Sequence, residues 1–138
     1  VPFPLMVPTV IEATSIPDPE VPVRAYRIQG RHMAVRLTFR TGGRRYWGIQ
    51  MTDWADAPVL AERNTRQMLD GRPFDLYYRG PKLHMVVLRQ RGVTYWVVNS
   101  LLDELSNETM LAIAKGLRPL DQPAGARGKA RRPGSARK

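Results

Sequence analysis

The sequence predicts an α+β fold, an antiparallel meander sheet of about five to six strands with one C-terminal helix packed on one face. Two observations predict it. Short hydrophobic runs separated by turn residues follow one another from residue 24 to residue 100. A single stretch with hydrophobic residues at helical spacing comes after them, at residues 106–117. One helix after a series of strands is typical of this class.

The first predicted strand is "RAYRIQG", residues 24–30, and the next two form a hairpin. In residues 33–39 every second residue is hydrophobic, which is the two-residue period of a strand with one buried face. The "TGG" at residues 41–43 has the residues of a turn. The run "RRYWGIQMT", residues 44–52, is therefore the returning strand.

Three further strands follow an irregular segment. Pro58 argues against regular structure in "DWADAPVLAERN", residues 53–64. A turn is predicted at Asp70-Gly71, and a strand at Phe74–Tyr78. The runs "LHMVVLRQRG" and "VTYWVVNS", residues 83–92 and 93–100, complete the sheet.

The helix has start and stop signals. Ser106 is a favourable N-cap, and Glu108 places an acid in the first turn. Gly116 and Pro119 are expected to end the helix. Its hydrophobic stripe is formed by residues at i, i+3, i+4 and i+7, namely Met110, Ile113, Ala114 and Leu117.

Composition divides the chain into three parts. Residues 1–23 are rich in proline and predict an extended arm or linker; residues 24–120 form the α+β domain; residues 121–138 are expected to be a disordered basic tail.

The absence of cysteine excludes disulfides, thiolate metal sites and thiol catalysis. Because the chain begins at Val1, we expect a piece of a longer protein or a processed product.

The aromatic stretch "RRYWGIQMTDW", residues 44–54, has two interpretations. Trp47 can pack between sheet and helix, with Gly48 permitting close approach of the backbone. Alternatively, Trp47 or Trp54 forms the floor of a ligand cleft in which Gln50, Thr52 and Asp53 supply polar contacts. Aromatic residues in strands are more often core, so the first interpretation is favoured.

Other candidate ligand contacts lie at the ends of strands. Asn99 and Ser100 usually cap or turn, but they could line the mouth of a cleft with Trp54. Arg44 and Arg45 lie at a hairpin turn and could contact anionic groups.

No motif for catalysis, a metal or a cofactor is present. His32 and His84 have no metal-ligand partner at helical or hairpin spacing, so we predict no metal site and no cofactor. A small enzyme would need an unrecognised site around Asp53, Trp54 and His84.

The net charge is +10, and the tail is its most concentrated source. A basic tail binds polyanions of several kinds, including DNA and phospholipid headgroups, and does so nonspecifically. A nucleic-acid-associated or regulatory protein acting through this tail is therefore an alternative function. The predicted polyanion-binding residues of the tail are Arg127, Lys129, Arg131, Arg132, Arg137 and Lys138.

Three blocks of the sequence resemble a known family. The blocks "YWGIQMTDWADAPVL", "GRPFDLYYRGPKLHMVVLR" and "TYWVVNSLLDELSNETMLAIAKGLRPL" are similar to the C-terminal accessory region that follows the catalytic domain in actinobacterial LytR–CpsA–Psr proteins. The lead-in "VPFPLMVPT" with "RAYRI" is similar too, so the resemblance covers about residues 1–120.

The resemblance implies an extracytoplasmic, cell-envelope location and a context in cell-wall glycopolymer transfer. The motifs of the family's catalytic domain are not in this chain, so it implies a non-catalytic binding module rather than an enzyme. The implied partners are a cell-wall glycopolymer, a polyprenyl-phosphate-linked lipid, or an upstream catalytic domain.

Overall fold

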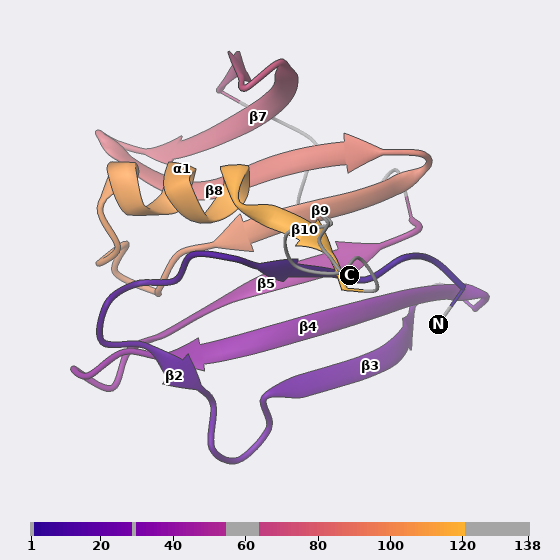
Figure 1. Ribbon diagram of the computed structural model, residues 1–138, viewed down its shortest axis with the longest axis horizontal. Coiled ribbons are helices and arrows are strands. Elements are labelled where there is room, and N and C mark those ends of the chain that lie inside the picture. The colour runs from indigo at the N-terminus through magenta and orange to yellow at the C-terminus, as the bar shows by residue number, and fades with distance from the viewer. Residues whose placement is uncertain (1, 29, 55–63, 121–138) are drawn as a thin grey trace, which may run out of the picture.

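The computed structural model describes residues 2–28, 30–54 and 64–120. Its main element is an eight-stranded sheet in which all pairings are antiparallel (Figure 1). The strand order is β2-β4-β5-β9-β8-β7-β6, and β3 also pairs with β4. The strands are β2 (Ile16–Pro17), β3 (Val23–Ile28), β4 (His32–Arg40), β5 (Tyr46–Thr52), β6 (Thr65–Leu69), β7 (Arg72–Arg79), β8 (Lys82–Gln90) and β9 (Val93–Val98).

The α+β prediction is confirmed, and the sheet is larger than expected. Two meanders, β3–β5 and β6–β9, are joined by the pairing of β5 with β9. This pairing sets Gly48 opposite Val98, so the start of β5 lies beside the end of β9. The turn before β5 and the loop after β9 are thereby brought to the same end of the sheet.

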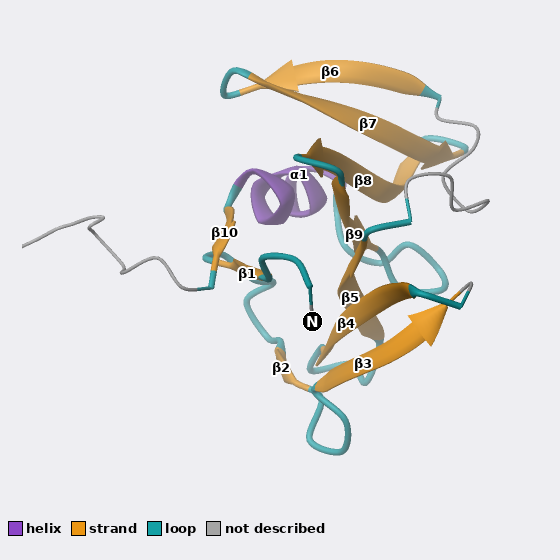
Figure 2. Ribbon diagram, turned by 90° about the vertical axis from the view of Figure 1, so that its right-hand side faces the viewer, coloured by secondary structure: helices purple, strands orange, loops and turns teal. Residues whose placement is uncertain are grey.

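The helix α1 (Asn107–Lys115) lies on one face of the sheet, together with β1 (Met6–Pro8) and β10 (Leu117–Pro119) (Figure 2). Its predicted caps are confirmed: the Ser106 hydroxyl accepts a hydrogen bond from the backbone N–H of Thr109 at 3.1 Å, and Gly116 ends the helix. The strand β10 was not predicted. It pairs with β1, which belongs to the arm.

The described part of the arm is built into the fold. Phe3 and Met6 are buried in the main core, and β2 pairs with the end of β4. The arm is extended, as the prolines predict, and it crosses the sheet beside the helix (Figure 1).

The main core lies between the sheet, the helix and the arm. Trp47 is fully buried there; its ring stacks on Phe39 with centroids 4.5 Å apart, and its indole N–H donates to the Ser15 hydroxyl at 2.8 Å. The next residue is Gly48, where a Cβ would lie 2.7 Å from the carbonyl oxygen of Leu37. Glycine is therefore required by the close approach of β4.

A second hydrophobic cluster lies on the opposite face of the sheet. It consists of Tyr77, Met85, Val87 and Trp96, with Trp54 and Val98 packed against it. Beside it, the carboxylate of Asp75, 3% exposed, accepts hydrogen bonds from Arg66 and Arg89. The predicted irregular residues 55–63 and the predicted basic tail, 121–138, lie outside the described residues.

Candidate functional site

The structure shows that the cleft interpretation of the aromatic stretch is wrong for Trp47. Trp47 has an exposed fraction of 0% and faces the main core, so it cannot contact a ligand in the folded protein. The alternation along β5 explains this, because Trp47, Ile49 and Met51 all point to the helix side.

Gln50 and Trp54 belong to the other face of the sheet. Gln50 is partly buried and pairs in register with Trp96 of the second cluster. Trp54 is partly buried and stacks on His32, with ring centroids 6.3 Å apart. Both are separated from Trp47 by the sheet, so these three residues do not form one cleft.

Asn99 is also not a ligand contact. It is 4% exposed, and its amide donates to the carbonyls of Leu83 and Leu105, both at 2.9 Å. Its side-chain oxygen accepts the N–H of Ser100 at 2.7 Å and of Leu105 at 3.0 Å. All these contacts are internal, so Asn99 has a structural role and does not line a cleft with Trp54.

The residues required by the enzyme hypothesis are at opposite ends of β5. Asp53 follows the end of β5 and contacts His32, with Oδ1 3.2 Å from Nδ1. His84 lies on β8, and its carbonyl accepts the N–H of Asn99 just after β9, so His84 is at the end of the sheet where β5 starts, with β9 between them. A strand of this length spans about 20 Å, so Asp53, Trp54 and His84 do not share a site.

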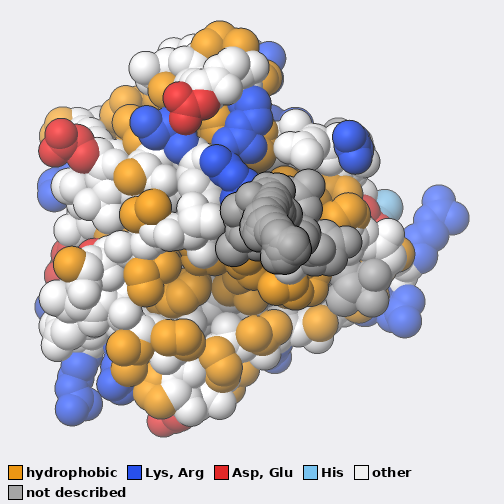
Figure 3. All heavy atoms as spheres, in the orientation of Figure 1, with side chains coloured by type: hydrophobic (Ala, Val, Ile, Leu, Met, Phe, Trp, Pro, Cys, Tyr) orange, Lys and Arg blue, Asp and Glu red, His pale blue; other side chains and the backbone are white. Residues whose placement is uncertain are grey.

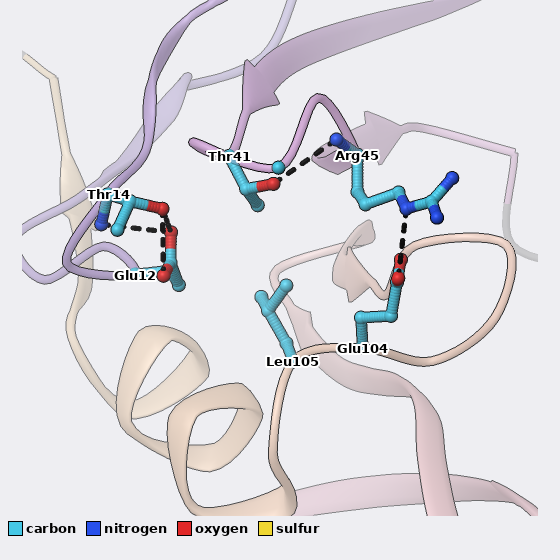
Figure 4. Close-up of a pocket in the computed structure, with 7 residues that line it drawn as sticks. Glu12, Thr14, Thr41, Arg45, Glu104 and Leu105 are labelled. Carbon is cyan, nitrogen blue, oxygen red and sulfur yellow. Dashed lines mark hydrogen bonds and ion pairs between the residues drawn. The ribbon is translucent and has the colours of Figure 1, made fainter.

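Arg44 and Arg45 are the predicted residues that line surface recesses. Arg45 takes part in a polar recess of about 380 Å³. Three segments distant in sequence meet there: the arm, the β4–β5 turn and the loop before α1 (Figure 4). The lining residues are Glu12, Thr14, Thr41, Gly43, Arg45, Glu104 and Leu105.

The polar recess offers both donors and acceptors. The Glu12 carboxylate accepts the Thr14 N–H at 3.0 Å, the Thr14 hydroxyl at 2.7 Å and the Ser15 hydroxyl at 2.8 Å. Burial raises the pKa of Glu12, but these hydrogen bonds lower it more, so the group is held as an anion. Arg45 Nε lies 2.9 Å from Glu104 Oε2, and its two terminal nitrogens point away from that carboxylate (Figure 4).

A second recess, of about 300 Å³, lies on the other side of the Arg45–Glu104 pair. It is more apolar, and its lining residues are Arg44, Arg45, Tyr46, Ser100, Leu101, Leu102 and Glu104. Sequence reasoning missed Leu101, Leu102 and Glu104, and also Glu12 and Thr14. For the two leucines, a signal was available in the sequence: they follow Asn99 and Ser100 directly and belong to no hydrophobic periodicity.

The loop of residues 99–105 is held by an ionic cluster as well as by Asn99. Asp103 is 5% exposed and has a φ of 55°. Its carboxylate accepts Arg79 Nε at 3.1 Å and Nη2 at 3.2 Å, and Oδ1 lies 2.6 Å from His84 Nδ1. Burial raises the pKa of Asp103, but hydrogen bonds and charge from Arg79 and His84 lower it more, so the net shift is downward. The pKa of Asp75 is lowered in the same way, by Arg66 and Arg89.

The lowered pKa values of Asp103 and Asp75 predict that the free energy of unfolding decreases in acid. A lowered pKa adds stability that is fully present above the unfolded pKa, roughly 3.9, and is lost as the pH falls through the folded value. At pH 7, Asp103→Asn should lower the free energy of unfolding by about 1–3 kcal/mol. This difference should shrink when urea titrations are repeated below pH 4. Asp70→Asn, at an exposed turn, is the control. A deficit that stays constant with pH would contradict the stabilising role of the Asp103 charge.

Within residues 2–28, 30–54 and 64–120 there is no group of three or more His, Cys, Asp or Glu arranged to hold a metal ion. In the part of the chain that the structure describes, no helix is long and apolar enough to cross a bilayer.

Figure 3 shows the face that carries the helix and the arm, with hydrophobic side chains gathered over its lower half.

Comparisons with known proteins give no relative: no protein-family model, curated protein or solved structure matches the chain.

Proposed function

We propose that this chain is a non-catalytic binding module of a cell-envelope protein, and that it holds a cell-wall glycopolymer in the polar recess. The family resemblance of residues 1–120 suggests the context. The observation that carries the proposal is the recess itself, in which carboxylates, threonine hydroxyls and a guanidinium surround about 380 Å³ of open space.

The chemistry of this recess suits a hydroxyl-rich polymer, because two carboxylates and two threonine hydroxyls line it. The carboxylates of Glu12 and Glu104 can accept hydrogen bonds from sugar hydroxyls. The terminal nitrogens of Arg45 point away from the Glu12 side of the recess (Figure 4), so at its edge they form a planar pair of donors that fits a phosphate or carboxylate of a bound polymer. Tyr46, 49% exposed in the neighbouring recess, presents a ring against which a sugar face can pack.

The context proposed from the resemblance is extracytoplasmic, next to a glycopolymer-transferring domain. Such a module would keep the polymer near the catalytic domain, which raises its effective concentration there without performing chemistry.

The test is a calorimetric titration of the full chain with purified cell-wall glycopolymer at moderate salt. Arg45→Gln should weaken binding about tenfold, because one charge-assisted, bidentate contact is lost. Arg31→Gln, at an exposed turn between β3 and β4, is the matched control and should leave the affinity within about twofold.

A third variant separates the recess from the tail. In it, the six basic residues of 121–138 are replaced by glutamine. If that variant loses all binding while Arg45→Gln binds like the parent, the tail is the polyanion-binding element and the recess proposal is wrong. The nucleic-acid alternative would then gain support if duplex DNA also binds with a steep salt dependence.

A further inference from the structure

We propose that the loop of residues 99–105 is a lipid-docking loop, which inserts Leu101 and Leu102 into the surface of an anionic membrane. Leu101 is 82% exposed and Leu102 is 67% exposed, the two largest exposed fractions among the large hydrophobic side chains of the described residues. The proposal rests on this exposure and on the charges around it. It does not depend on glycopolymer binding in the polar recess.

The local backbone does not account for two leucines at this position. The N–H of Asp103 donates to the carbonyl of Ser100 at 2.9 Å, so Leu101 and Leu102 are the central residues of a turn. Exposed turns favour Gly, Pro, Asn, Asp and Ser at such positions. Leucine here adds no local hydrogen bond and leaves apolar surface in water, so folding gains little from it.

The loop is held rigidly in this exposed form. Asn99 ties both of its ends together through the hydrogen bonds to Ser100 and Leu105. The Ser100 hydroxyl accepts the N–H of Glu104 at 2.9 Å and donates to its carboxylate at 3.0 Å. Arg79 Nη2 donates to the carbonyl of Leu101 at 3.0 Å. The loop therefore cannot fold its leucines back without breaking buried polar contacts, and little ordering is needed on docking.

The leucines are surrounded mainly by cations. Arg44 and Arg45 line the same recess as the two leucines, and Arg79 contacts the loop backbone. Lys82 Nζ lies 3.4 Å from the carbonyl oxygen of Asp103. Arg79 is paired with the buried carboxylate of Asp103 and Arg45 with that of Glu104, so Arg44 and Lys82 supply the excess positive charge of this rim. Apolar side chains inside a basic rim are the arrangement that binds anionic lipid surfaces.

The size of the apolar surface favours a membrane over a protein partner. A stable protein interface buries about 800 Å² on each side, around a well-packed hydrophobic centre. Two leucines on an exposed turn, with Tyr46 lining the same recess, provide far less apolar surface than that. They are enough for interfacial insertion, because each buried methylene contributes and the excess positive charge of the rim adds electrostatic attraction.

The experiment uses the absence of cysteine in this chain. The full-length variant L101C is labelled with an environment-sensitive fluorophore and mixed with vesicles of phosphatidylcholine, alone or in an equal mixture with phosphatidylglycerol. We expect a blue shift of the emission with the anionic vesicles only. The matched control is M68C, labelled on β6, where Met68 is 63% exposed, and its emission should not shift.

A second, unlabelled variant measures the contribution of the side chains. The double substitution Leu101→Ser with Leu102→Ser should weaken partitioning onto anionic vesicles about tenfold or more, at an unchanged melting temperature, because both side chains are exposed.

Three outcomes would overturn the proposal. The L101C label can remain in water while the chain sediments with the vesicles, which would assign lipid binding to the basic tail. Both labels can shift equally, which would indicate nonspecific adsorption. The chain can fail to bind any vesicle, which would leave a protein partner as the occupant of the loop.

Discussion

Replacing Trp47 by alanine is expected to lower the free energy of unfolding by about 3–5 kcal/mol, the usual cost of truncating a buried aromatic residue to alanine. The side chain is fully buried, its ring stacks on Phe39, and its indole N–H is satisfied by Ser15. Alanine removes the packing. It also removes the donor to the hydroxyl of Ser15, a buried residue. Urea denaturation followed by circular dichroism measures the loss.

Trp54→Ala is the control from the same stretch of sequence. Trp54 is only partly buried and packs against the smaller cluster, so its loss should cost clearly less than that of Trp47. Trp47→Phe should recover part of the stability, because it restores the stacked ring without the indole N–H. Equal losses for Trp47→Ala and Trp54→Ala would contradict the separation of these residues into a core face and an outer face.

The two-residue period of the strands carried most of the fold prediction. In β5 the residues on one side of the alternation, Trp47, Ile49 and Met51, are all fully buried against the helix side. The helix was equally predictable, because Ser106 and Gly116 mark its ends by local chemistry. Both signals come from neighbours in sequence, and for that reason one chain is sufficient to detect them.

The elements that were missed depend on distant residues. β10 consists of only three residues and forms because the arm supplies β1 as its partner, more than a hundred residues away. Proline in the arm excluded a central strand, which is correct, but short edge pairings such as β1 and β2 remain compatible with it.

The recesses were not predictable for the same reason. Arg45 was a candidate because it lies at a turn, but its position beside Glu104 follows from the pairing of β5 with β9. Glu12 reaches the same recess from the arm. No spacing along the chain encodes this meeting. Asn99 illustrates the opposite error, since a polar residue at a strand end suggested a cleft and instead satisfies four backbone groups.

Replacing Asn99 by alanine is expected to lower the free energy of unfolding by about 3 kcal/mol or more. The substitution leaves the carbonyls of Leu83 and Leu105 and the N–H groups of Ser100 and Leu105 without this partner, and buried groups cost about 1–3 kcal/mol each when unsatisfied. The total stays below the full sum because a loosened loop admits water. The loss is measured by urea denaturation at neutral pH.

Asn107→Ala provides the matched comparison, because Asn107 makes the same kind of contacts from a more exposed position. It accepts the N–H of Leu83 at 2.8 Å and donates to the carbonyl of Pro81 at 3.0 Å, and its loss should cost only about 1 kcal/mol. Asn99→Ala should also weaken vesicle docking, since Leu101 and Leu102 are then no longer held in place, whereas Asn107→Ala should not. If Asn99→Ala were as stable as the parent, the loop would not owe its shape to this amide. If it were unstable yet docked normally, rigidity would not be what makes the leucines effective, and the basic rim would have to supply the affinity.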